Sequence, residues 1–232
     1  MQKGNRMEIK KKYVIIVAGG QGLRMGGEIP KQFMVIGNYP ILMHTLNTFF
    51  QYDNKIHIIL VLPHSHQEYW NQLCKDYNFH IKHTVVNGGD SRFASVYNGL
   101  NIISEPGLIA VHDGVRPFTS QEVIATAFKK AELFGAVIPV IEVIDSLREI
   151  LPDGSSKSVP RQKFRAVQTP QVFRSDILKR AYSQTYNEWF TDDASVVESA
   201  GYTVYLISGN TENIKITTPQ DLLLAEMFIS HV

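Results

Sequence analysis

Two cationic side chains, Arg24 and Lys31, lie in and just after a glycine-rich stretch near the start of the sequence. The stretch VIIVAGGQGLRMGGEIPKQF (14–33) runs from apolar residues into glycines, whose exposed N–H groups can form an anion cradle. Charge that builds up on the α-phosphate of a nucleoside triphosphate is stabilised by donors held in advance. The stretch therefore predicts a phosphate site with Arg24 and Lys31 as catalytic residues. Ordinary surface cations beside a tight turn are the alternative interpretation.

Two common phosphate-binding loops do not fit this stretch. A dinucleotide fingerprint aligned on Gly20 and Gly22 needs a small residue where Met25 stands. A P-loop aligned on Gly22 and Gly27 needs a lysine where Glu28 stands. The loop must therefore hold its phosphates in another way.

The segment NGGDSRFASV (87–96) places glycines before a predicted helix that Ser91 or Asp90 can cap. On the residues alone, a plain capping turn accounts for this segment.

The segment VHDGVRPF (111–118) ends an apolar run on Asp113. A carboxylate at this position can bind a metal, accept a substrate hydroxyl or cap a turn. The histidines are scattered, and His64 and His66 lack a third ligand nearby in the sequence, so we expect no zinc site. We expect His112 to pack rather than to bind a metal.

Two further segments carry cations. In ENIKIT (212–217), we expect Lys215 on a short strand between Ile214 and Ile216, where alternation directs it to solvent. Arg161 and Ser146 lie in a β-prone region and, on the residues alone, are side chains of an exposed hairpin.

Apolar runs alternate with amphipathic stretches along the chain, which predicts a series of βαβ units. We expect strands at 13–18, 57–62, 81–86, 108–112, 136–140 and 203–208, and helices at 41–50, 67–78, 92–103, 120–134, 174–184, 193–200 and 218–229. Runs such as VIIVA and IILVLP are typical of a parallel sheet covered on both faces. We therefore predict an α/β, Rossmann-like fold with a mostly parallel twisted sheet. The glycine-rich stretch then lies at its carboxyl edge, where such sheets bind ligands.

The alternation breaks between residues 141 and 171, around the turn signal PDGSS. We expect a hairpin arm that projects from the sheet, and arms of this kind often pair with a second copy of the chain, so we predict a homodimer. The polar residues 1–12 are expected to form a flexible leader, and residues 13–232 a single domain.

Composition excludes several classes of protein. The 232 residues include 23 basic and 22 acidic side chains and carry a formal charge of +1, which argues against nucleic acid as a partner. The apolar run 14–18 is too short for a signal peptide or a membrane span, so we expect a cytoplasmic protein without a membrane partner. The single cysteine, Cys74, excludes an internal disulfide.

Five motifs, in order, resemble those of the alditol-phosphate cytidylyltransferase family: AGGQGLRM with PKQF, NGGDSRFASV, VHDGVRPF, QTPQVF and ENIKIT. The resemblance extends from Tyr13 to about Ile229 and implies a nucleotidyltransferase domain. It implies CTP and an alditol phosphate as substrates, and Mg²⁺ as a cofactor held mainly by the CTP phosphates, with Asp113 as a possible ligand.

The resemblance also implies roles for individual residues. The nucleotide would be bound by Ala18, Gly19, Gly20, Gly22, Gly89, Asp90 and Ser95. The alditol phosphate would be bound by Asp113, Gly114, Arg116, Ser146, Arg161 and Lys215, with Arg161 supplied from the arm of the partner subunit. Ser146 stands where relatives usually carry threonine, and Gly114 where they more often carry alanine.

The choice of alditol phosphate stays open at this point. The motifs favour 2-C-methyl-D-erythritol 4-phosphate, an intermediate of non-mevalonate isoprenoid biosynthesis, and ribitol 5-phosphate is the alternative. A catalytically silent nucleotide-binding regulatory domain is the alternative from another class. The cations Arg24, Lys31, Arg161 and Lys215 together argue against it.

Overall fold

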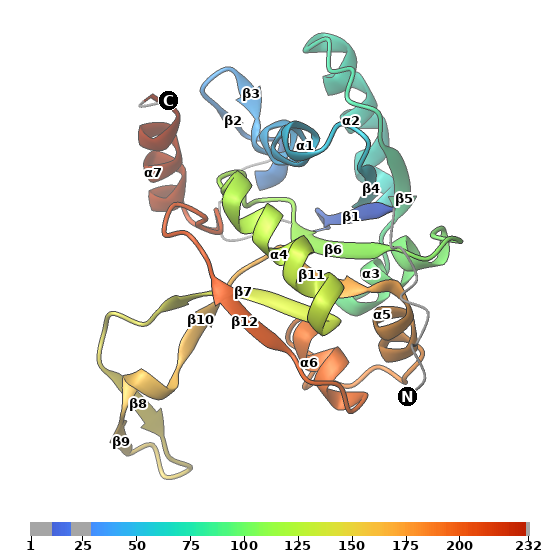
Figure 1. The fold of residues 1–232 in the computed structure, drawn as a ribbon. Helices are drawn as coiled ribbons and strands as arrows, with labels where there is room; N and C mark the ends of the chain where they lie inside the picture. Colours follow the sequence, from blue (N-terminus) through green and yellow to red (C-terminus); the bar gives the residue numbers. More distant parts are fainter. Residues whose placement is uncertain (1–10, 20–28, 231–232) are drawn as a thin grey trace, which may run out of the picture.

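The computed structural model describes residues 11–19 and 29–230 and contains an eight-stranded mixed sheet (Figure 1). Its strands are β1 (Lys12–Val17), β4 (His57–Leu62), β5 (Thr84–Asn87), β6 (Leu108–Asp113), β7 (Ala136–Glu142), β10 (Arg165–Val167), β11 (Gln171–Arg174) and β12 (Tyr205–Ser208). The order is β10-β7-β11-β6-β1-β4-β5, and β12 also pairs with β7. The pairs of β1 with β4 and β6, of β4 with β5 and of β7 with β12 are parallel, which confirms the predicted mostly parallel α/β sheet.

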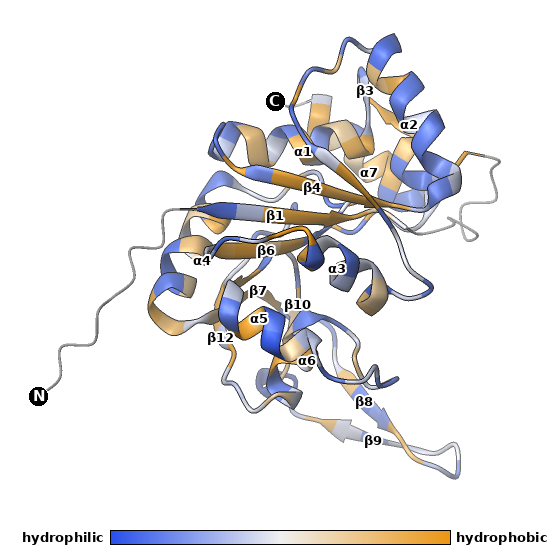
Figure 2. Cartoon of the chain, turned by 90° about the vertical axis from the view of Figure 1, so that its right-hand side faces the viewer, coloured by the Kyte–Doolittle hydropathy of each residue, from blue (hydrophilic) through white to orange (hydrophobic). Residues whose placement is uncertain are grey.

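Helices cover both faces of this sheet: α1 (Ile41–Tyr52), α2 (His64–Asp76), α3 (Arg92–Asn101), α4 (Gln121–Phe134), α5 (Ser175–Tyr182), α6 (Asp193–Ser199) and α7 (Pro219–Ser230). Val14 and Ile16 of β1 belong to the core under α1, α2 and α4, while Ile15 belongs to the core under α3, α5 and α6. This alternation explains why the strand is apolar throughout. The apolar strands β1, β4 and β6 are visible between the helices in Figure 2. Among the described residues, no helix is long and apolar enough to span a membrane.

The expected helices and the expected sheet strands are all present, with shifted ends. Helix α2 begins at His64 instead of residue 67, directly after Pro63, whose restricted φ suits the residue before a helix. Strand β5 begins at Thr84 instead of residue 81, because residues 79–83 turn away to pack around Trp70. Residues 1–10 of the predicted leader lie outside the described residues, and β1 begins at Lys12.

One predicted strand is wrong, and several short strands were not predicted. No regular element is assigned to residues 213–217, because the buried Asn213 side chain and one backbone bond, from Ile216 N–H to the Val115 carbonyl, hold this segment. Strand β11 is inserted antiparallel between β6 and β7, and β2 (Val35–Ile36) and β3 (Tyr39–Pro40) form a small separate ribbon. These strands have two to four residues, too short to give a periodic signal.

The hairpin expected around PDGSS is present as β8 (Leu147–Ile150) and β9 (Ser156–Val159), followed by a 3₁₀ turn, η3 (Arg161–Lys163). Figure 1 shows it projecting away from the sheet. The projecting part is shorter than the predicted range 141–171, because β10 returns to pair with β7 and residues 168–171 are buried in the body of the domain.

His112, near the end of β6, is fully buried and connects three segments. Its Nδ1 lies 3.0 Å from the hydroxyl of Thr169, which itself lies 3.1 Å from the donating N–H of Asp113. Its Nε2 lies 3.0 Å from the carbonyl oxygen of Arg116. These partners assign a neutral ring with the proton on Nε2. Burial lowers the pKa of His112 to about 4, so the predicted packing role fits the structure.

The free energy of unfolding should therefore fall as the pH drops from about 6.5 to about 4. Unfolded His112 takes up a proton near its ordinary pKa of 6.5, whereas the folded group does so only near 4. The stabilisation is fully present above the higher value and is lost toward the lower one, by about 3 kcal/mol in total. Urea unfolding across this range measures it. His112→Gln should flatten the slope, with the exposed His80→Gln as control, and an unchanged slope in His112→Gln would contradict the assignment.

Candidate active site

A pocket of about 510 Å³ opens at the carboxyl ends of β1, β4, β5 and β6. The residues that follow these strands meet there because the strands are parallel: Ala18 and Gly19 after β1, Pro63 after β4, Gly88 to Arg92 after β5, and Asp113 at the end of β6. Lys31, Gln32, Ser95 and Lys215 also line it, together with Val17, His64 and Val115. This is the edge at which the sequence predicts a ligand site.

Asp113 is the charged centre of this pocket and is 8% exposed. Its Oδ2 lies 3.1 Å from Arg116 Nε and 3.0 Å from Lys215 Nζ, and its Oδ1 lies 3.8 Å from Arg92 Nε. Burial alone would raise the pKa of Asp113, but the positive charges of Arg92, Lys215 and Arg116 hold it well below its usual range. The carboxylate is therefore ionised at neutral pH.

Cations outnumber carboxylates in this cluster. Arg92 also pairs with the buried Asp193, so Arg92, Arg116 and Lys215 face two carboxylates and leave one positive charge in excess. An excess of positive charge in a recessed, partly desolvated pocket favours an anionic ligand. The cluster is therefore suited to a phosphate group.

The side chain of Lys215 points to the pocket and not only to solvent. Its neighbour Ile216 is fully buried, so alternation along a strand would direct Lys215 to solvent alone. Its ion pair with Asp113 explains the orientation. Arg116 Nη1, 2.8 Å from the carbonyl oxygen of Asn213, ties the same segment to the loop after β6. Tertiary contacts, and not strand alternation, therefore decide where Lys215 lies.

Lys31 begins a 3₁₀ turn, η2 (Lys31–Phe33), and lines the pocket. Gln32, 1% exposed, donates from Nε2 to the Ala18 carbonyl over 2.9 Å, which fixes Lys31 beside the end of β1. Phe33 packs against the rings of Tyr69 and Trp70. Sequence reasoning missed Gln32, for which the only signal was a polar residue inside the PKQF motif.

Part of the glycine-rich stretch lies outside the described residues. It includes Gly20, Gly22 and Arg24, whose roles stay predictions. Ala18 and Gly19 line the pocket, and among the described residues a Cβ on Gly19 would meet no atom within 4 Å. The described part of the chain therefore leaves the Gly19 backbone open to a ligand.

The second motif forms a tight turn before α3. A Cβ on Gly89 would lie 2.5 Å from the Cβ of Ala94, so only glycine fits without a shift. The buried Ser95 accepts a hydrogen bond from the Gly89 N–H over 3.1 Å, and Ser91 caps α3 by accepting from the Ala94 N–H. Asp90 is exposed at the pocket and does not serve as the helix cap. Ser95 thus shapes the turn that carries Asp90.

Gly114 is not one of the described residues that line the pocket, although the resemblance implies that it binds substrate. A Cβ there would lie 2.8 Å from the Cβ of Ala18 and 3.1 Å from Leu42 Cδ1. Its N–H donates to the Val17 carbonyl over 2.9 Å. Gly114 therefore lets β6 approach the end of β1 closely.

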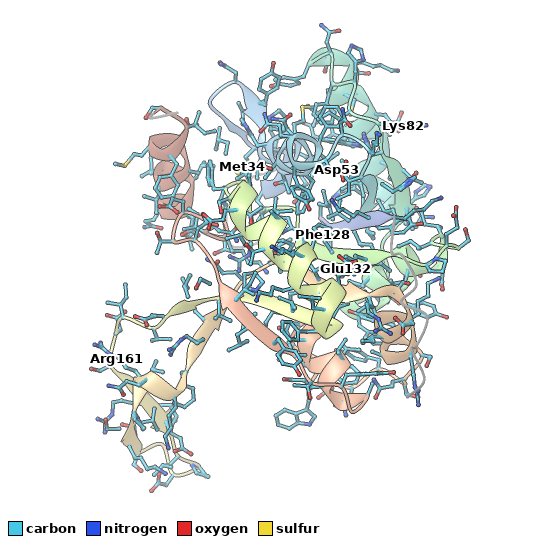
Figure 3. All side chains as sticks on the ribbon, in the orientation of Figure 1. Met34, Asp53, Lys82, Phe128, Glu132 and Arg161 are labelled. Carbon is cyan, nitrogen blue, oxygen red and sulfur yellow. The ribbon has the colours of Figure 1, made fainter. Side chains whose placement is uncertain are left out.

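Ser146 and Arg161 are not brought to this pocket within one chain. Both are exposed on the arm, and Figure 3 shows Arg161 far out on it. Arg161 Nη1 donates to the Ile144 carbonyl, and the side chain borders a separate hollow with Glu142, Gln162 and Arg165. Their predicted roles thus require another chain.

Sequence reasoning also missed residues that support the site. Gln168 donates to the carbonyls of Asn210 and Asn213, and Thr169 joins His112 to the N–H of Asp113. Gln171 bridges the start of α6 by contacts with Asp192 and the Ala194 N–H, and Arg92 pairs with Asp193. The available signal was the presence of polar side chains next to apolar runs, as in QTPQVF.

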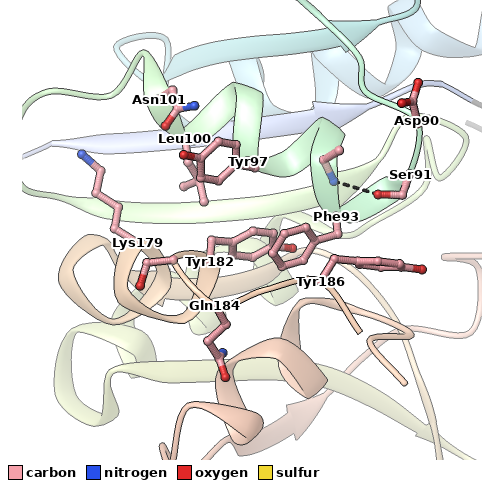
Figure 4. Close-up of a pocket in the computed structure, with 12 residues that line it drawn as sticks. Asp90, Ser91, Phe93, Tyr97, Leu100, Asn101, Lys179, Tyr182, Gln184 and Tyr186 are labelled. Carbon is pink, nitrogen blue, oxygen red and sulfur yellow. Dashed lines mark hydrogen bonds between the residues drawn. The ribbon is translucent and has the colours of Figure 1, made fainter. Parts of the chain in front are cut away.

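A second pocket of about 900 Å³ lies between α3 and α5 (Figure 4). Its walls include four aromatic side chains, those of Phe93, Tyr97, Tyr182 and Tyr186. The charges converge on the smaller pocket, so we assign the chemistry there.

In the described part of the chain, no group of three His, Cys, Asp or Glu residues could hold a metal ion.

Comparison with known sequences identifies the family of this chain. The model of the family "2-C-methyl-D-erythritol 4-phosphate cytidylyltransferase" (IspD) matches residues 12–231. The chain is similar to the curated enzyme of that name from Phocaeicola vulgatus, with 54% identity over 94% of this chain and 99% of the relative. It is also similar to the one from Bacteroides fragilis, with 54% identity over 93% and 98% of the two chains.

Solved structures give the same result. The fold is similar to 4-diphosphocytidyl-2C-methyl-D-erythritol synthase from Anaerococcus prevotii, with a TM-score of 0.81, 27% identity and coverage of 95% of this chain and 99% of that one. It is also similar to the 2-C-methyl-D-erythritol 4-phosphate cytidylyltransferase from Thermus thermophilus, with a TM-score of 0.77, 32% identity and coverage of 96% and 100%. The resemblance seen in the five motifs is confirmed, and the chain belongs to the 2-C-methyl-D-erythritol 4-phosphate cytidylyltransferase family.

Proposed function

We propose that the pocket around Asp113 carries out the reaction of this family, with Lys31, Asp113 and Lys215 in named roles and Arg116 as an ion-pair partner of Asp113. The chain is a nucleotidyltransferase that joins CTP and 2-C-methyl-D-erythritol 4-phosphate to give 4-diphosphocytidyl-2-C-methyl-D-erythritol and pyrophosphate, for isoprenoid precursor biosynthesis. The observation that carries the residue roles is the convergence of cations on Asp113 beside Lys31 and the turn at Gly89. Cytoplasmic location and the absence of a nucleic-acid partner stay predictions.

The nucleotide occupies the side of the pocket formed by the ends of β1 and β5. Ala18, Gly19 and the turn at Gly89 offer backbone groups there, and Asp90 offers an acceptor suited to the cytosine amine. Lys31 lies on the same wall, where its charge reaches the α-phosphate. The predicted partner of Lys31 is Arg24.

The alditol phosphate occupies the side formed by Asp113 and Lys215. Its phosphate oxygen attacks the α-phosphorus of CTP, the new O–P bond forms, the bond to the β-phosphate oxygen breaks, and pyrophosphate leaves. The nucleophile is already an anion, so no general base is required. Asp113, kept ionised by its cations, accepts hydrogen bonds from the substrate hydroxyl groups, and Lys215 holds the phosphate in line.

We assign Mg²⁺ to the phosphates of CTP and not to Asp113. Asp113 Oδ2 already lies within about 3 Å of Arg116 and Lys215, which leaves this oxygen poorly suited to a second cation. A pocket with few carboxylates fits an ion that arrives on the triphosphate and keeps several waters. The ion would neutralise charge on the leaving pyrophosphate.

We further propose that a homodimer completes the site through the arm. Arg161 lies on the projecting arm (residues 143–164), away from the pocket of its own chain, and the arm exposes Ile144 (79%) and Ile150 (72%). Apolar side chains on a projecting arm favour a covered position against a second copy. Arg161 of one chain then clamps the alditol phosphate bound by the other.

Pyrophosphate release tests the substrate assignment. With CTP and Mg²⁺, 2-C-methyl-D-erythritol 4-phosphate should give rapid release, and ribitol 5-phosphate should give release at least about 100-fold slower, because a mispaired buried polar group is costly. EDTA should stop the reaction. Preferred use of ribitol 5-phosphate would favour the rival substrate, and release with neither would favour a regulatory nucleotide-binding domain.

Lys31→Ala should lower kcat by about 100-fold to 1,000-fold while the melting temperature stays close to that of the wild type, because a preorganised donor on the developing charge is lost. Steady-state kinetics and a thermal melt measure both quantities. Lys75→Ala, an exposed lysine of α2, is the matched control. Near-normal turnover in Lys31→Ala would remove Lys31 from the chemistry.

Mixed subunits test the shared site. Arg161→Ala and Lys31→Ala chains, each inactive alone, should regain up to about a quarter of wild-type activity after mixing and refolding, since half the dimers are hybrids with one intact site. Lys163→Ala, on the same 3₁₀ turn as Arg161, serves as the control for arm damage. No recovery in the mixture would place Arg161 and Lys31 in the site of a single chain, or outside it.

A further inference from the structure

Arg92 lies between two carboxylates, Asp113 in the pocket and Asp193 behind it. Its guanidinium binds Asp193 in a bidentate manner, with 3.0 Å from Nη1 to Oδ1 and 2.7 Å from Nη2 to Oδ2. Its Nε lies 3.8 Å from Asp113 Oδ1. A single planar group therefore joins the end of β6 to the start of α6.

Local rules do not favour arginine at this position. Arg92 is the first residue of α3, directly after the cap residue Ser91. The positive end of the helix dipole disfavours a cation there. A residue that violates a local preference is expected at sites where function requires it.

Asp193 is itself held firmly. It is fully buried, and its Oδ1 accepts a hydrogen bond from Tyr182 Oη over 2.6 Å. The Tyr182 ring stacks on Phe93, the neighbour of Arg92, with ring centroids 4.6 Å apart (Figure 4). A buried, bidentate pair with one more donor leaves the guanidinium a single orientation.

The other side of Asp113 is also occupied. Arg116 and Lys215 both contact its Oδ2, so its Oδ1 is the oxygen that faces Arg92. Rotation of the carboxylate would move Oδ1 away from the guanidinium. The fixed position of Arg92 therefore sets the plane of the carboxylate.

We propose that Arg92 is a positioning residue that acts through Asp113. Asp193 and Tyr182 anchor the guanidinium, and the guanidinium orients the carboxylate that receives the hydroxyl groups of the alditol phosphate. This inference rests on the proposed function for the assignment of the alditol pocket to Asp113.

Calorimetry tests it without turnover. Each protein is titrated first with the α,β-methylene analogue of CTP, and the resulting complex is then titrated with 2-C-methyl-D-erythritol 4-phosphate. The proteins are the wild type and the variants Asp193→Asn, Arg92→Lys and Tyr182→Phe. The Kd of the alditol phosphate should rise about 10-fold to 50-fold in Asp193→Asn and Arg92→Lys, and about 3-fold in Tyr182→Phe, which keeps the ring. The Kd of the CTP analogue should stay within about 3-fold, because Arg92 acts on Asp113.

Two controls separate positioning from folding. Arg174 pairs with Asp176 in a bidentate manner at the surface, so Arg174→Lys should leave both Kd values unchanged. In an Asp113→Asn background, adding Arg92→Lys should cause no further rise in the Kd of the alditol phosphate. A merely structural role would lower the binding stoichiometry and the melting temperature without selecting one substrate.

Three results would overturn the proposal: an unchanged Kd of the alditol phosphate in Asp193→Asn and Arg92→Lys, an equal loss for the CTP analogue, or full additivity with Asp113→Asn. Failure of the proposed function has a different outcome. Wild-type protein would then release no pyrophosphate from CTP with this alditol phosphate, in the assay described above.

Discussion

The site depends on one buried carboxylate, that of Asp113. Arg92, Arg116 and Lys215 come from three different segments and would repel one another without it. Their charges in turn keep the buried carboxylate ionised. This mutual dependence gathers an excess of positive charge at the edge of the sheet, where a phosphate can bind. The same arrangement gives the carboxylate a defined orientation.

Buried polar side chains hold the irregular segments around this centre. Gln32 fixes the turn that carries Lys31, and Gln168 and Asn213 hold the segment that carries Lys215. Thr169 joins His112 to the backbone of Asp113. Each bond satisfies a group that would be costly to bury alone. The parallel sheet brings these loops to one edge, and the hydrogen bonds decide how the side chains point.

In the proposed dimer, the arm brings a cation of a second chain to this charged centre. Within one chain the pocket has its nucleotide side and the Asp113 cluster, while Arg161 lies on a hairpin that projects from the sheet. On the proposed dimer, binding between chains also completes the charge of the alditol pocket. Such a shared site would link activity to assembly, because an isolated chain would lack the proposed phosphate ligand Arg161.

The sequence by itself determined the α/β fold and the family. Continuous apolar runs, helix caps and the five ordered motifs are local patterns. Such patterns can be recognised in the sequence of one chain without its three-dimensional structure. It also identified Lys31, Asp113, Arg116 and Lys215, which the structure brings together, though it expected Lys215 on a strand. Arg92 and the buried polar residues of QTPQ were missed, because their roles arise from partners distant in sequence.

Only the tertiary structure decided which charges meet. Arg92 and Asp193 are separated by 101 positions along the chain, and no spacing rule connects them. The insertion of β11 between β6 and β7, and the close approach of Gly114 to Ala18, likewise follow from pairing in three dimensions. Long-range ion pairs and strand order depend on the whole packed sheet, whereas periodicity and capping depend on neighbours along the chain.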